Sequence, residues 1–122
     1  MAIVREALDK LFDLIGGDPG SLAELIESFL EESPLLVGQM QQAADAGDRT
    51  VLGRAAHTLK SSARDFGASQ LSVLCEALEK SCRDSMPEQA IRQVDAIRAE
   101  CALAQEDLIL HLTRLKRGVW SK

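Results

Sequence analysis

Residues 49–67 read RTVLGRAAHTLKSSARDFG, and their apolar side chains recur at helical rather than strand spacing. An α-helix turns by about 100° per residue, so positions three, four and seven apart share a face. The residues expected on the buried face are Leu52, Ala55, Leu59, Ala63 and Phe66. His57 lies on the opposite face. The segment therefore predicts an amphipathic helix from about Arg49 to Phe66, with Asp48 as its N-cap and Gly67 at its end.

Two further helices are expected before this segment. The first covers Ile3 to Ile15, and the second begins either at Asp18-Pro19 or at the capping box formed by Ser21 and Glu24. The inward-facing residues expected in the second helix are Leu22, Leu25, Ile26, Phe29 and Leu30. Because proline removes a backbone donor, Pro34 is expected to kink or interrupt this helix.

Two more helices are expected after residue 67. Ser69 can cap a fourth helix that reaches Cys82, and Ser85 with Glu88 forms a second capping box before the last helix. The apolar residues expected inside that last helix follow near-heptad spacing and are Ile91, Val94, Ile97, Cys101, Ala104, Leu108 and Leu115. Short connections between long helices place neighbours antiparallel.

The fold class predicted by this pattern is all-α, an antiparallel four-helix bundle with a short N-terminal capping helix. Leu, Ala and the long straight-chain residues outnumber Val, Ile and Thr, which also favours helix. No repeat or long linker divides the chain, so residues 1–122 are expected to form a single domain.

Composition restricts the partners that the chain is expected to bind. The net charge of −5 would repel a phosphate backbone, and no basic run with interleaved aromatics occurs, so nucleic acid is not expected. No apolar stretch approaches the roughly 18 residues that span a bilayer, and the first ten residues do not resemble a signal peptide. We expect no membrane association, a cytoplasmic location and a monomer. The three cysteines are expected to be reduced core residues.

The exposed face of the helix at residues 49–67 concentrates positive charge around His57. Arg54, Lys60 and Arg64 lie within about 60° of His57 on the helical wheel. Gly53 and Ser61 on the same face are small, so the ring is accessible to another protein. Like charges three or four residues apart repel, so the cluster predicts that an anionic group binds at this face. The alternative is an ordinary surface histidine.

The stretch from Ala55 to Ala68, AAHTLKSSARDFGA, resembles the signature of the histidine phosphotransfer (HPt) family, roughly A-H-x-L-K-G-x-A-x-x-x-G. The residues that continue the resemblance into the next helix are Leu71, Cys75, Leu78 and Glu79. The resemblance implies that His57 accepts a phosphoryl group and that Lys60 steadies it, and Arg64 on the same face is expected to assist Lys60 as an electrostatic clamp. The chain departs from the family at Ser61, where glycine is usual.

The same resemblance implies a phosphorelay carrier that exchanges phosphoryl groups with receiver domains, with a hybrid sensor histidine kinase as a further partner. The other residues expected at the binding face are Arg54, Gly53, Ser61, Gly67 and Glu79. Glu79 stands where the family often has a group that orients the imidazole, although a solvated flank residue is an equal alternative. No phosphate-binding loop is found, so the chain is not expected to be an autonomous kinase or other enzyme. No cofactor is expected, because the metal ion belongs to the receiver.

Three other readings of the sequence remain. A helical adaptor that binds signalling partners without being phosphorylated is the main alternative. A metal site is not expected, because His111 stands on the last helix without a Glu-x-x-His partner and is interpreted as an ordinary flank residue. An enzyme acting on a small molecule is disfavoured, because no second acid–base group accompanies His57 in the sequence.

Overall fold

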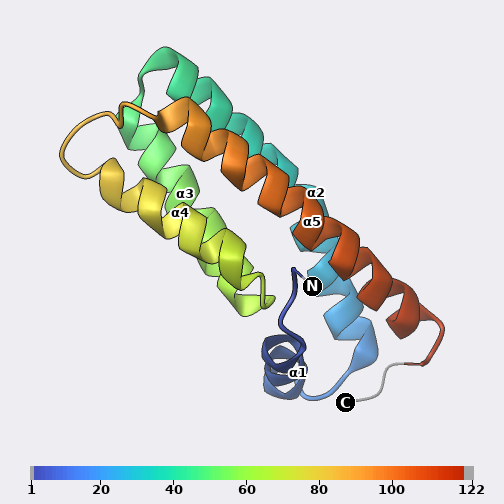
Figure 1. The fold of residues 1–122 in the computed structure, drawn as a ribbon. Helices are drawn as coiled ribbons and strands as arrows, with labels where there is room; N and C mark the ends of the chain where they lie inside the picture. Colours follow the sequence, from blue (N-terminus) through green and yellow to red (C-terminus); the bar gives the residue numbers. More distant parts are fainter. Residues whose placement is uncertain (1, 120–122) are drawn as a thin grey trace.

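The computed structural model describes residues 2–119, and this part of the chain consists of helices without strands. The helices are α1 (Arg5–Leu14), α2 (Pro19–Ala46), α3 (Arg49–Asp65), α4 (Ser69–Ser81) and α5 (Ala90–Lys116). Helices α2 to α5 lie side by side, and α1 packs across one end (Figure 1). The predicted all-α bundle with a short N-terminal helix is confirmed. The single-domain prediction for residues 1–122 also covers residues outside the described part.

Aspartates begin two of the helices in the way that the sequence indicates. The Asp18 carboxylate accepts a hydrogen bond from the Ser21 backbone at 3.1 Å, and Pro19 occupies the first turn of α2. The Asp48 carboxylate accepts from the Val51 backbone at 3.2 Å and caps α3. Each cap satisfies one backbone donor that the first helical turn leaves without a partner. Of the two starts considered for the second helix, the one at Asp18-Pro19 is correct.

Two expectations about helix starts are wrong, and the expectation for Pro34 is wrong in part. Helix α2 runs through Pro34 without interruption, and Pro34 lies on its exposed side, where water can compensate for the lost backbone donor. Ser69 is the first residue of α4 rather than its cap. Ser85 and Glu88 form no capping box, and α5 begins only at Ala90, after a turn in which the Ala90 backbone donates to the Pro87 carbonyl at 3.3 Å.

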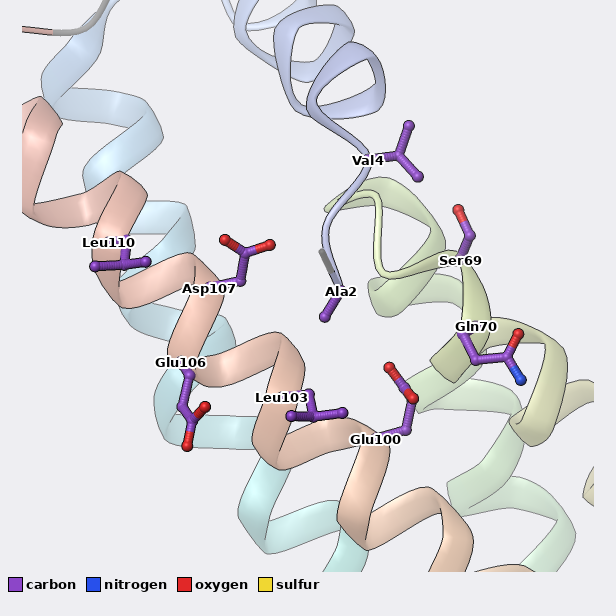
Figure 2. A pocket seen from close by; sticks show the side chains of 9 residues that line it. All are labelled: Ala2, Val4, Ser69, Gln70, Glu100, Leu103, Glu106, Asp107 and Leu110. Atoms are coloured by element: carbon purple, nitrogen blue, oxygen red, sulfur yellow. The ribbon is translucent and has the colours of Figure 1, made fainter.

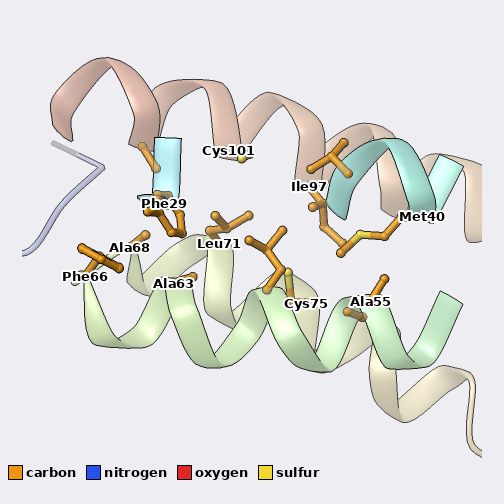
Figure 3. Close-up of a cluster of buried hydrophobic side chains, with 14 of the residues drawn as sticks. Phe29, Met40, Ala55, Ala63, Phe66, Ala68, Leu71, Cys75, Ile97 and Cys101 are labelled. Carbon is orange, nitrogen blue, oxygen red and sulfur yellow. The ribbon is translucent and has the colours of Figure 1, made fainter. Parts of the chain in front are cut away.

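The interior of the bundle contains the face of α3 that the helical spacing predicts. The five α3-segment residues expected inside are all buried, and Leu52, Leu59 and Ala63 have no exposed surface. Figure 3 shows how side chains from several helices meet in this core. The Phe66 ring packs on Phe29 of α2 with ring centroids 5.0 Å apart, within the range of favourable aromatic contacts. Two apolar residues expected inside are exposed instead, Leu25 by 37% and Ile91 by 58%.

Helices α3 and α4 are shorter than α2 and α5, and the N-terminal part of the chain covers the end that they leave open (Figure 1). The Val4 backbone donates to the Gly67 carbonyl at 2.8 Å, at the turn between α3 and α4. The Ile3 backbone donates to Oδ2 of Asp107 on α5 at 2.9 Å. These two bonds attach residues 2–4, here called the N-terminal segment, to the turn between α3 and α4 and to α5.

The histidine on α5 has a different environment from the one expected. His111 is buried, with 6% of its surface exposed, and its Nε2 lies 3.7 Å from Oδ1 of Asp107. Burial lowers the pKa of His111, because the charged imidazolium loses its hydration, although the Asp107 carboxylate acts in the opposite direction. The prediction of an ordinary flank residue is therefore wrong. The burial agrees with the spacing of α5, because His111 lies three residues after Leu108 and four before Leu115, which are both buried.

All three cysteines are buried and free, as expected. Cys75 lies in the middle of α4, Cys82 directly after its last residue, and Cys101 in the middle of α5. Burial raises the pKa of the Cys75 thiol to about 12, and it also raises the pKa of Cys82 and Cys101. The thiols therefore stay protonated and pack as small apolar groups.

The turn at Gly67 generates a stability prediction. Gly67 has a φ of +81°, and a Cβ atom there would stand 2.6 Å from the Val4 carbonyl oxygen. We expect Gly67→Ala to lower the free energy of unfolding in urea by about 2 kcal/mol or more, from left-handed strain together with this backbone clash. Gly47→Ala is the matched control, since φ is +72° but no atom lies within 4 Å of the added Cβ. Equal losses for both variants would contradict the clash.

Candidate functional site

His57 lies in the middle of α3 and faces away from the core, as the helical spacing predicts. Its side chain is 59% exposed. The ring is nevertheless held on one side, because Nδ1 lies 2.7 Å from Oε2 of Glu79 on α4. A carboxylate can only accept a hydrogen bond, so Nδ1 carries the proton in this contact. In the neutral ring, Nε2 is then the nitrogen with a free lone pair.

Glu79 also binds the lysine that lies one turn after His57. Nζ of Lys60 donates to Oε1 of Glu79 at 2.6 Å, and both side chains are only 18% exposed. The Lys60 hydrogen bond, followed by contacts with the His57 ring, holds the pKa of Glu79 below its ordinary value despite the cost of partial burial. Lys60 is therefore held by a partner within the chain and is not a free cation of the exposed face. One carboxylate joins both residues.

Close packing of α3 on α4 makes this arrangement possible. A Cβ atom at Gly53 would lie 3.2 Å from Cβ of Cys82, so the glycine allows the two helices to approach closely. Ala56, next to the histidine, is fully buried. Gly53 therefore has a packing role in the helix pair in addition to leaving space beside His57.

A shallow depression beside the ring, here called the His57 hollow, is rich in arginine. Its lining residues are Arg49, Thr50, Gly53, Arg54, His57, Glu79, Cys82 and Arg83. Nη1 of Arg49 donates to the Arg83 carbonyl at 3.0 Å, which ties α3 to the loop after α4. Arg54 was expected at this face, whereas Arg49 and Arg83 were missed. Arg49 stands two turns before His57 and was detectable by spacing, but Arg83 lies on an irregular loop.

Three expected site residues have other surroundings. Arg64 lines a separate depression beside Leu11 and Leu14, about 10.5 Å along the helix axis from His57. Gly67 is buried under the N-terminal segment and not at the binding face. The Ser61 hydroxyl donates back to the His57 carbonyl at 3.3 Å, so its hydrogen is engaged within α3.

The fold and the site define a helical bundle that presents one exposed histidine, oriented by a carboxylate from the neighbouring helix. The sequence matches the family model of the Hpt domain over residues 24–108, and the chain belongs to this family. Its function is that of a phosphocarrier in a phosphorelay. A search among curated proteins found no match.

Solved structures of the same fold come from bacteria and a plant. Histidine-containing phosphotransfer protein B of Pseudomonas aeruginosa PAO1 is 22% identical, with a TM-score of 0.85 over 93% of this chain and 96% of that one. The maize phosphotransfer protein ZmHP2 is 20% identical, with a TM-score of 0.80 over 98% and 88%. The HPT domain of a Shewanella sensor hybrid histidine kinase is 17% identical, with a TM-score of 0.73 over 88% and 92%. Among the helices described, none is long and apolar enough to cross a membrane.

The contact between Glu79 and His57 generates a prediction about the ring. We expect ¹⁵N NMR to show the neutral His57 ring protonated at Nδ1, with this preference lost in Glu79→Ala because the acceptor is removed. Glu79→Gln is the matched control, since its side-chain oxygen still accepts a hydrogen bond. A tautomer that is the same in Glu79→Ala and the unmodified chain would show that Glu79 does not orient the ring.

Proposed function

We propose that His57 is the residue that carries the phosphoryl group and that Nε2 is the atom that bears it. The observation that supports this most directly is the Nδ1 contact with Glu79, which leaves Nε2 as the free nucleophile on an exposed ring. His111, the other histidine of the chain, is buried beside Asp107 and is not accessible to a partner protein.

In the proposed transfer, Nε2 attacks the phosphorus of an aspartyl phosphate on a receiver domain. A P–N bond forms, the P–O bond to the aspartyl group breaks, and the receiver regains its carboxylate. The ring then bears positive charge, which the Glu79 carboxylate stabilises through Nδ1–H. Transfer to a second receiver reverses these steps. An aspartate oxygen of that receiver attacks the phosphorus, a P–O bond forms, the P–N bond breaks, and its electron pair returns to Nε2.

Lys60 has two possible acceptors during this reaction. In the unphosphorylated chain its ammonium group is bound by Glu79. A phosphoryl group on Nε2 brings about −1.5 to −2 charges to the same face and competes for the ammonium by charge-assisted hydrogen bonds. Glu79 thus keeps Lys60 near the ring before the phosphoryl group arrives. Arg49, Arg54 and Arg83 add positive charge to the His57 hollow, where the acidic pocket of a receiver would approach.

The proposed partners are the receiver domains and hybrid kinases of two-component systems. The metal ion that neutralises charge in the transfer belongs to the receiver, and this chain is proposed to need no cofactor of its own. We propose that it does not take phosphate from ATP unaided, since its sequence has no phosphate-binding loop. The experiment described next also distinguishes this carrier from the adaptor considered in the sequence analysis, which is never phosphorylated.

The decisive experiment uses His57→Gln. Receiver domains from the source organism, phosphorylated with acetyl phosphate and Mg²⁺, are mixed with the chain, and bound phosphate is tested for lability in acid and stability in alkali. We expect acid-labile phosphate on the unmodified chain and none on His57→Gln. Because the ring is exposed, the substitution should change the free energy of unfolding by less than about 0.5 kcal/mol. A stable complex without transfer would support the adaptor, and phosphate on His57→Gln would contradict the assignment.

Lys60 and Arg64 are expected to differ in their effects. Lys60→Ala should slow acceptance from a receiver by roughly tenfold, equivalent to 1.4 kcal/mol, because the ammonium beside the ring is lost. Arg64→Ala should stay within about twofold of the unmodified rate, since its charge lies outside the His57 hollow and is screened by water. Quenched-flow measurements of the rate at which each variant accepts the phosphoryl group from one receiver provide the test. Equal effects of the two substitutions would mean that only net charge matters.

A further inference from the structure

A second depression, here called the acidic groove, lies between the N-terminal segment, the start of α4 and the middle of α5 (Figure 2). Its volume is about 660 Å³, and it shares no lining residue with the His57 hollow. The lining residues that matter here are Val4, Glu100, Leu103, Glu106, Asp107 and Leu110. Neither the core nor the phosphotransfer site accounts for this surface.

The wall formed by α5 exposes an apolar stripe. Leu103 is 51% exposed, Leu110 is 56% exposed, and Val4 beside them is 45% exposed. Leu103 and Leu110 are seven residues apart, which places them on one face about 10.5 Å apart along the axis. Leucines at this spacing are typical of a helix surface that packs against another helix. The two leucines therefore form an exposed surface of the kind that a second helix can cover.

Negative charge flanks the stripe on both sides. Glu100 and Glu106 stand three residues before and after Leu103, at about 60° to either side on the helical wheel. The lining of the groove includes no lysine or arginine. A helix that packs on the leucines would therefore place its own flanking side chains against carboxylates.

Asp107 adds a negative charge at the floor of the groove. Only 6% of its surface is exposed, and Oδ1 has no hydrogen-bond partner, although His111 Nε2 lies 3.7 Å away. Burial lowers the pKa of His111, which disfavours the charged imidazolium beside Asp107, although the Asp107 carboxylate acts in the opposite direction. A buried carboxylate in a low-dielectric wall strengthens the negative potential of the groove above it.

We propose that the acidic groove binds a basic amphipathic helix of a partner protein. Apolar residues of that helix, spaced i, i+3 or i+4, and i+7, pack on Leu103, Leu110 and Val4. Its lysine or arginine side chains flank this stripe and pair with Glu100 and Glu106. A second copy of the chain fits less well, because it brings the same acidic flanks and a net charge of −5 to the interface. An anionic membrane surface is repelled for the same reason.

The groove and the His57 hollow have no lining residue in common, so a helix bound in the groove leaves the residues of the hollow uncovered. A partner held in the acidic groove would therefore stay attached while a receiver exchanges its phosphoryl group. The groove is a recruitment surface, and it does not depend on the proposed chemistry of His57.

The test uses a designed 18-residue peptide with an acetylated N-terminus and an amidated C-terminus. It has leucines at the a and d positions of its heptads and lysine or arginine at the flanking positions. Binding to the full chain is followed by fluorescence anisotropy and by backbone amide shifts. We expect the shifts to map to the groove, and we expect the peptide to bind at least tenfold more tightly than a version with every basic residue replaced by glutamate.

Variants of the chain complete the test. The double substitution Leu103→Gln and Leu110→Gln should lower the affinity for the basic peptide at least tenfold. Ile109 lies on the same helix outside the groove and is 49% exposed, so Ile109→Gln should leave this affinity unchanged. All three substitutions should leave phosphoryl acceptance at His57 unchanged, so failure here is distinct from failure of the proposed function. Equal affinity for both peptides, or for all variants, overturns the proposal. Self-association, or binding to anionic vesicles, that the leucine substitutions abolish would also overturn it.

Discussion

The close approach of α3 to α4 is the constraint on which the site depends. Gly53 allows it at one point, where an added Cβ would stand 3.2 Å from Cys82, and the small, buried Ala56 lies on the same helix one residue before the histidine. At this separation, Glu79 reaches both His57 and Lys60 across the helix interface. A side chain at Gly53 would press on Cys82 and disturb the helix approach on which both contacts depend.

The site is organised by one carboxylate more than by its cations. Breaking a partly buried ion pair leaves a charge without a partner, so Glu79 and Lys60 hold each other in place. The same carboxylate determines which nitrogen of His57 is free. Rigid helices position all three groups, and this preorganisation suits a residue that must react during a brief encounter with another protein.

The sequence predicted those features that depend on one helix at a time. The phase of α3 follows from the spacing of Leu52, Leu59 and Phe66, and the two aspartate caps follow from local hydrogen bonding. Features that depend on how helices meet were not predictable in this way. The Glu79 contact requires the rotation of α3 relative to α4, and the hydrogen bond from Ile3 to Asp107 requires the N-terminal segment to lie beside α5. The burial of His111, in contrast, follows the spacing of α5 between Leu108 and Leu115 and was predictable from the sequence. The irregular loop that places Arg83 in the His57 hollow has no periodic signal.

Alkylation of the buried cysteines can be used to measure local opening of the structure. Only an exposed thiolate reacts with alkylating reagents, and burial keeps all three thiols protonated. Alkylation must therefore wait for the structure around each sulfur to open. Cys82 at the end of α4 would report fraying of that helix, while Cys75 and Cys101 would report separation of α4 or α5 from the bundle. Labelling kinetics can thus compare the motions of these helices without any engineered probe.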